Sequence, residues 1–138
     1  MIPSHIVISP INARSKIEKL ILSTDKELIV YVQTLNDDHI LSLLQSLYDK
    51  KKDIQICTAD NESNRARMIE FSQWKWKIIR KPYLHAKVII VDRNHIFIGS
   101  HNLTTNAIEN NREIGIILDN RTDIVEQIYN NFISDGCR

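Results

Sequence analysis

The stretch "HAKVIIVD", residues 85 to 92, predicts a buried β-strand that begins with two basic side chains. Side chains alternate across a strand, so His85 and Lys87 are expected to point the same way. Asp92 falls on the opposite face, which predicts a structural role in anchoring the turn that follows. A solvated lysine beside an ordinary histidine at a strand end is the alternative interpretation, because polar residues are common there.

A second polar group, "GSHN" at residues 99 to 102, follows this strand. Gly99 allows close approach of the backbone, and Ser100 and Asn102 are two positions apart, on one side of an extended chain. With the charge of Lys87, their hydroxyl and carboxamide groups form a donor set suited to the non-bridging oxygens of a phosphate. The two segments together therefore predict a phosphate site beside His85.

The spacing His-x-Lys-x4-Asp-x6-Gly-Ser-x-Asn, from His85 to Asn102, resembles without a gap the HKD signature of the phospholipase D superfamily. It is similar in particular to the single-motif endonucleases of that superfamily. The resemblance implies His85 as nucleophile, Lys87 and Asn102 as phosphate ligands, and Ser100 as a supporting hydrogen bonder. The segment "NREIGIIL", residues 111 to 118, resembles the family's strand with an acidic partner for the histidine, which implies Glu113 as the orienter of His85.

The chemistry of this residue set can also be argued directly. An imidazole nitrogen can attack phosphorus, and water can later resolve the phosphohistidine. A second histidine must then protonate the departing alkoxide. Lysine and asparagine stabilise the charge on the equatorial oxygens, so we expect neither a metal nor another cofactor.

The sequence contains one HxK motif, whereas this mechanism needs two histidines. A two-fold homodimer would bring His85 and Lys87 of two subunits to one shared site. Alternatively, the chain is half of a two-motif enzyme, because residues 6 to 37 resemble the opening of the C-terminal halves of such proteins. Of these two interpretations, the homodimer is the one we favour.

Length and composition predict a single domain over residues 1 to 138. The 138 residues are 43% hydrophobic, enough to bury one sizeable core. A formal net charge of +1 means that attraction to nucleic acid must come from local patches.

Cys57 and Cys137 make neither a metal cluster nor a disulfide framework, so we expect reduced thiols in the cytoplasm. No signal peptide or run of roughly 18 apolar residues is seen, so no stable membrane insertion is expected.

Hydrophobic patterning predicts an α/β domain with a mixed β-sheet flanked by helices. Helices are expected after Asn12 as a cap, over 40 to 48, up to about Gln73, and from Asp123 to about Ser134. His95 is expected in a turn, "DRNH". Strands are expected at 5 to 9, 28 to 33, 54 to 57, 74 to 79, 85 to 92, 95 to 100 and 113 to 118.

Basic residues precede the motif and are interleaved with Trp74 and Trp76; they are Arg65, Arg67, Lys75, Lys77, Arg80 and Lys81. This pattern predicts contacts to a nucleic-acid backbone and stacking on bases. The alternative, with equal weight, is a solvated face with both tryptophans in the core. The remaining histidines, His5, His39, His95 and His101, are expected to be structural or solvated.

Three functions are consistent with these residues. The first is an endonuclease or related nucleic-acid phosphodiesterase, with DNA as the favoured polymer. The second is a lipid-directed phospholipase D or phosphatidyltransferase, and the third is a non-catalytic nucleic-acid-binding module. Every motif residue is intact, which disfavours the third. No amphipathic segment is left over for a membrane surface, which disfavours the second.

Overall fold

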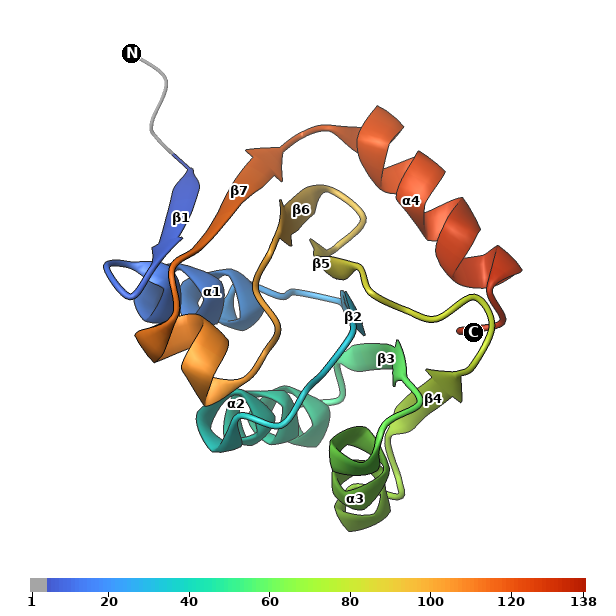
Figure 1. Cartoon of the computed structure of the whole chain (residues 1–138). Helices are drawn as coiled ribbons and strands as arrows, with labels where there is room; N and C mark the ends of the chain where they lie inside the picture. Colours follow the sequence, from blue (N-terminus) through green and yellow to red (C-terminus); the bar gives the residue numbers. More distant parts are fainter. Residues whose placement is uncertain (1–4) are drawn as a thin grey trace.

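The computed structural model of the chain describes residues 5–138, which form a mixed sheet with helices on both faces (Figure 1). The seven strands have the order β1-β7-β6-β5-β2-β3-β4. The predicted α/β class and mixed sheet are therefore confirmed. The strands are β1 (Ile6–Ser9), β2 (Glu27–Val32), β3 (Asp53–Ala59), β4 (Lys75–Ile79), β5 (Lys87–Val91), β6 (His95–Gly99) and β7 (Glu113–Asp119).

Strand direction divides the sheet into a parallel and an antiparallel part. β2, β3 and β4 run parallel, as expected for strands connected by helices. β5 pairs antiparallel with β2 and continues through β6 and β7 by antiparallel pairing. The first strand then pairs with the last, with Ile6 opposite Ile116.

Each face of the sheet packs against its own set of helices. Leu28 and Val30 of β2 point into the larger core, under α1 (Ala13–Leu22), α2 (Asp38–Asp49) and α3 (Glu62–Glu70). Ile29 and Tyr31 of the same strand point into a second core under α4 (Thr122–Ser134). Because β2 is buried on both faces, its sequence is a continuous apolar run rather than an alternating one.

The third and last helices, and the Asn12 cap, differ from expectation in detail. α3 ends at Glu70 rather than Gln73, because the chain turns there to stack Phe71 on Trp74, with ring centroids 4.2 Å apart. Asn12 precedes α1, but its Oδ1 accepts from the backbone N–H of Ile8 at 2.8 Å and does not cap the helix. α4 begins one residue early, at Thr122. A short π-helix, η1 (Asn106–Asn110), was not predicted.

A disulfide joins Cys57 of β3 to Cys137, with Cα atoms 5.4 Å apart. The expectation of two reduced thiols is therefore wrong. The pair is separated by 80 residues in sequence, and the two positions meet only because α4 crosses the sheet and returns the chain to β3. Within residues 5–138, none of the helices has both the length and the apolar character that crossing a membrane requires.

Candidate active site

The motif residues other than Asp92 gather at one end of the sheet, where β2 and β3 end and β5 and β7 begin. Lys87 lies opposite Val32 at the end of β2, and Gly99, the last residue of β6, lies opposite Gly115 of β7. Strands that run in opposite directions thus bring both halves of the motif together. The predicted proximity of His85, Lys87 and "GSHN" follows from this register.

His85 and Lys87 lie side by side but differ in burial. His85 is exposed on the segment before β5, whereas the Lys87 side chain enters the interior and the residue is only 8% exposed. The Lys87 Nζ donates to the backbone oxygen of His85 at 2.7 Å and lies 3.1 Å from its Nδ1. Burial lowers the pKa of Lys87, and the charge of Glu113 opposes that shift. A fixed cation therefore lies within hydrogen-bonding distance of an accessible imidazole.

Asn102 is oriented by two contacts with the segment that follows β2. Its Oδ1 accepts from the backbone N–H of Thr34 at 3.0 Å, which directs the Nδ2 toward Gln33 Oε1 at 3.5 Å. Gln33 in turn donates to the hydroxyl of Tyr83 at 3.1 Å. Gln33 and Tyr83 were not predicted, because nothing in their spacing relates them to the motif. Tyr83 is 54% exposed and adds an aromatic surface two residues before His85.

Ser100 binds the neighbouring strand in this structure. Its Oγ accepts from the backbone N–H of Ile114 at 3.1 Å and lies 3.4 Å from the Ile114 oxygen. Gly99, one residue earlier, has no room for a side chain, because a Cβ there would lie 2.6 Å from the Cα of Gly115. These two residues hold β6 close to β7, and phosphate binding by Ser100 remains a prediction.

Glu113 begins β7 at the same end of the sheet. Within the described chain it accepts a hydrogen bond from Asn111 at 3.2 Å and none from His85. Its charge nevertheless acts on both Lys87 and His101, raising their pKa values against the effect of burial. The orienting role of Glu113 therefore remains a prediction that requires its side chain to turn toward His85.

His101 is fully buried inside the motif, and its ring meets Phe97 edge to face with centroids 5.4 Å apart. Neither ring nitrogen has a hydrogen-bond partner among residues 5–138. Burial lowers its pKa, which favours the neutral ring, although Glu113 acts in the opposite direction. Nothing in the sequence indicates this burial beyond the position of His101 between two polar motif residues.

Asp92 lies at the far end of β5 from His85. Its carboxylate accepts from the backbone N–H groups of Asp25, Lys26 and Glu27 at 2.8 to 3.0 Å. These bonds hold the segment that leads into β2, rather than the turn after Asp92. Burial raises the pKa of Asp92, but the three backbone donors outweigh it and the pKa is lowered.

The basic residues expected to contact nucleic acid are mostly paired with carboxylates. The pairs are Arg65 and Arg80 with Asp60, Arg67 with Asp38 and Glu70, and Lys75 with Asp53. Lys77 and Lys81 have no ion-pair partner within the described residues. Trp74 and Trp76 are 8% and 7% exposed, so base stacking on them is ruled out and the core interpretation of these rings holds.

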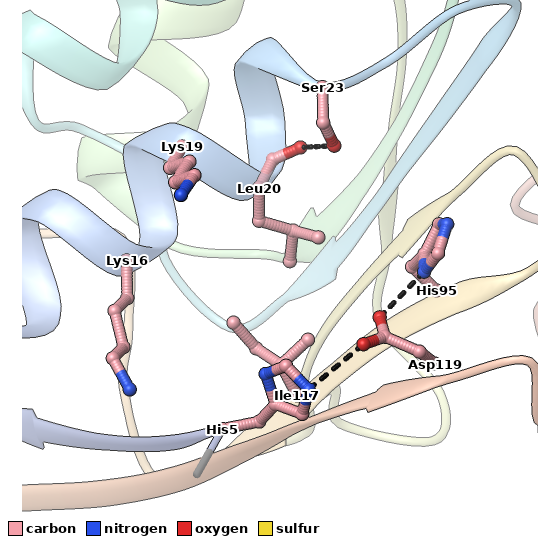
Figure 2. A pocket seen from close by; sticks show the side chains of 8 residues that line it. All are labelled: His5, Lys16, Lys19, Leu20, Ser23, His95, Ile117 and Asp119. Carbon is pink, nitrogen blue, oxygen red and sulfur yellow. Dashed lines mark hydrogen bonds and ion pairs between the residues drawn. The ribbon is translucent and has the colours of Figure 1, made fainter. Parts of the chain in front are cut away.

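A separate cluster of titratable residues lies at the opposite end of β6 and β7. A cavity of about 420 Å³ lies there. Among its lining residues, Figure 2 shows Asp119 between His5 and His95. Asp119 contacts His5 Nε2 at 3.0 Å and His95 Nδ1 at 2.6 Å. His95 is the first residue of β6, which confirms the strand predicted over 95 to 100 and not the turn predicted for His95. His5 has a partner in Asp119 that the sequence did not reveal. His39, which was expected to be structural or solvated, contacts Glu18.

Comparisons with known proteins agree with this geometry. Residues 17–135 match the family described as cardiolipin synthase, PLD-like domain. The phospholipase D family member Nuc from Salmonella typhimurium is 22% identical, with a TM-score of 0.88 over 97% of this chain and 93% of that chain. No curated protein sequence matches the chain.

Two larger proteins share the fold at lower identity. Phosphatidylserine synthase from Haemophilus influenzae Rd KW20 is 18% identical, with a TM-score of 0.72 over 91% of this chain and 36% of that chain. The archaeal chromatin protein TrmBL2, whose structure shows a novel mode of DNA binding, is 14% identical, with a TM-score of 0.67 over 94% of this chain and 50% of that chain. With the family match over most of its length and the motif gathered at one end of the sheet, the chain belongs to the phospholipase D-like family.

Proposed function

We propose that this chain is a phosphodiesterase that cleaves nucleic acid, with DNA as the favoured polymer, at a site completed by a second copy. The observation that carries the proposal is the accessible imidazole of His85 beside the buried ammonium of Lys87, 3.1 Å from its Nδ1. An exposed nucleophile can reach phosphorus in a large substrate, and a cation held by burial needs little reorganisation to stabilise the developing charge.

The reaction proceeds by two displacements. A ring nitrogen of His85 attacks phosphorus while the bond to the leaving oxygen breaks, and a second histidine gives that oxygen its proton. Water then attacks phosphorus, loses a proton to the second histidine, and releases His85 by breaking the phosphorus–nitrogen bond. Lys87 and the amide of Asn102 stabilise the non-bridging oxygens in both steps.

The second histidine would be His85 of another copy. Two-fold symmetry gives one copy the role of nucleophile and the other the role of acid, without any further motif. The alternative is that the second histidine lies in another half of a longer two-motif chain. The solved structures that share the fold include both sizes, since this chain corresponds to 93% of Nuc and to 36% of phosphatidylserine synthase.

Two observations bear on the substrate. Lys81 and Arg112 flank the motif segments, are exposed and have no ion-pair partner within residues 5–138, so they are available to phosphates. The shared fold with TrmBL2 also supports DNA, whereas the shared fold with phosphatidylserine synthase favours a lipid-directed enzyme as the second candidate.

The test is to incubate pure protein with supercoiled plasmid, a single-stranded oligonucleotide and phospholipid vesicles, each with and without excess EDTA. We expect nucleic-acid cleavage that persists in EDTA, because Lys87 supplies the charge stabilisation. The His85→Ala variant is the matched control for a contaminating nuclease. Strict dependence on magnesium would overturn the mechanism, and turnover of phospholipid alone would establish the second candidate.

A further inference from the structure

Tyr83 lies in the connection between β4 and β5, two positions before His85. It is 54% exposed, and among the aromatic residues of the described chain it is the only one in the exposed class. Trp74 and Trp76, which were expected to stack on bases, are buried. The exposed aromatic surface of residues 5–138 therefore lies beside the proposed nucleophile and not on the strand that carries the tryptophans.

The Tyr83 ring is held in place through Gln33. Its hydroxyl accepts from Gln33 Nε2 at 3.1 Å, and Gln33 Oε1 accepts from Asn102 Nδ2 at 3.5 Å. The backbone of Gln33 is itself fixed, because its N–H donates to the Ala86 oxygen at 3.0 Å and its oxygen accepts from Asn64 Nδ2 at 2.7 Å. One glutamine side chain therefore sets the position of the ring relative to the predicted phosphate ligand Asn102.

The chain between the ring and the nucleophile is short and anchored. Leu84, between Tyr83 and His85, is 4% exposed and packs in the second core. Two residues of chain span at most about 7 Å, a distance comparable to the length of one nucleotide along a strand. With a phosphate at His85, the base of an adjoining nucleotide would therefore be within reach of the Tyr83 ring.

We propose that the Tyr83 ring stacks on the base next to the cleaved phosphodiester, so that nucleic acid is bound there as a single strand. The inference rests on the proposed function and names its substrate class. In a duplex the faces of the bases are covered by neighbouring base pairs, whereas in a single strand they are accessible to an aromatic side chain. Every base has such a face, so Tyr83 selects strand state and not base sequence.

The experiment measures binding without turnover, in a His85→Ala parent that keeps Tyr83. Fluorescence anisotropy follows two labelled strands of equal length, one with ordinary bases and one made of abasic sites throughout. Tyr83→Leu in this parent should weaken binding of the ordinary strand by about 10-fold, because base stacking is lost, and should leave the abasic strand unaffected. Tyr83→Phe is the matched control, since it keeps the ring and should bind nearly as tightly as the parent. Circular dichroism shows that each variant folds.

A charge variant separates stacking from phosphate binding. Lys81 is exposed and has no ion-pair partner within the described residues. Lys81→Ala should weaken both strands alike and reduce the slope of the salt dependence by about one, because a phosphate contact is lost. Tyr83→Leu should leave that slope unchanged. A hairpin-closed duplex should bind the parent and Tyr83→Leu equally.

The outcomes separate stacking by Tyr83 from the reaction. A loss in Tyr83→Leu that is confined to the base-bearing strand supports the inference even if wild type cleaves nothing, in which case only the proposed function fails. Equal binding of that strand by the parent and Tyr83→Leu would overturn the inference, and cleavage by wild type would then leave the proposed function standing. An equal loss in Tyr83→Phe and Tyr83→Leu would also overturn it, because the hydroxyl acting through Gln33 would then be the group that matters.

Discussion

His85 and Lys87 differ in burial, and the proposed reaction requires that difference. In the proposal, the nucleophile His85 has to be accessible to a polymer, whereas the cation Lys87 has to stay in place while charge builds on phosphorus. The backbone oxygen of His85 helps to meet the second requirement, because it accepts from Lys87 Nζ at 2.7 Å. At the residue scale, the proposed site therefore depends on a few side chains, and each can be tested by a single substitution.

Replacement of His85 by alanine should abolish turnover, because no other histidine of the described chain lies at Lys87 Nζ. Glu113→Gln should reduce turnover by about 10²-fold or more if its charge orients the imidazole. The measurement is single-turnover cleavage, with circular dichroism to show that both variants fold. Wild-type activity in His85→Ala would mean that another site does the chemistry.

His101 should make the protein sensitive to acid. Burial lowers its pKa in the folded state, so the unfolded chain binds the proton more readily. The resulting stability is complete above the unfolded pKa of about 6.5 and falls as the pH drops below that value. His101→Phe should remove this loss, measured as urea unfolding at pH 5 and pH 8. The control is substitution of the exposed His39 by glutamine, which should leave the loss of stability at low pH unchanged. If His101→Phe shows the same pH dependence as the wild type, His101 is not the group responsible.

At the scale of elements, the features that could be predicted from the sequence are those that depend on local residue pattern and spacing. The strand that follows His85 and the "GSHN" segment were found from periodicity and polar residue types, and the register brings them together as expected. The partners of Asn102 were missed, because Gln33 approaches it through a contact between the segments after β2 and β6, where Leu35 pairs with Leu103. The disulfide was missed for a similar reason, since only the path of α4 brings Cys137 to Cys57.

Gly99→Ala should destabilise the fold by about 1–3 kcal/mol, because the added methyl group would meet the backbone of β7. The nearest atom, Gly115 Cα, would be 2.6 Å away and cannot move without shifting the strand. Urea unfolding of the two proteins measures the difference. If Gly99→Ala instead stabilises the protein through the unfolded state alone, the close approach of β6 and β7 is not required.

At the scale of the whole molecule, the active unit is proposed to be a pair of chains. If wild type and His85→Asn are mixed in equal amounts and exchange freely, about one quarter of the dimers contain two wild-type chains. Since the amount of dimer has doubled, activity should fall to about half of the unmixed wild-type value. Exchange is verified with a tagged subunit, and an inert protein replaces His85→Asn in the control. Full activity after exchange would show that each chain acts alone.

The pairing of β1 with β7 also has a consequence for folding kinetics. Ile6 and Ile116 are far apart in sequence, so closing this pair costs more loop entropy than the neighbouring hairpins β5–β6 and β6–β7. We expect β1 to join late during refolding and to detach early in local unfolding, since it is a short strand at the sheet edge. Amide hydrogens of β1 should then exchange faster than those of β2 and β5. The same detachment would transiently expose the edge of β7, a strand primed to pair with another chain and so to begin aggregation.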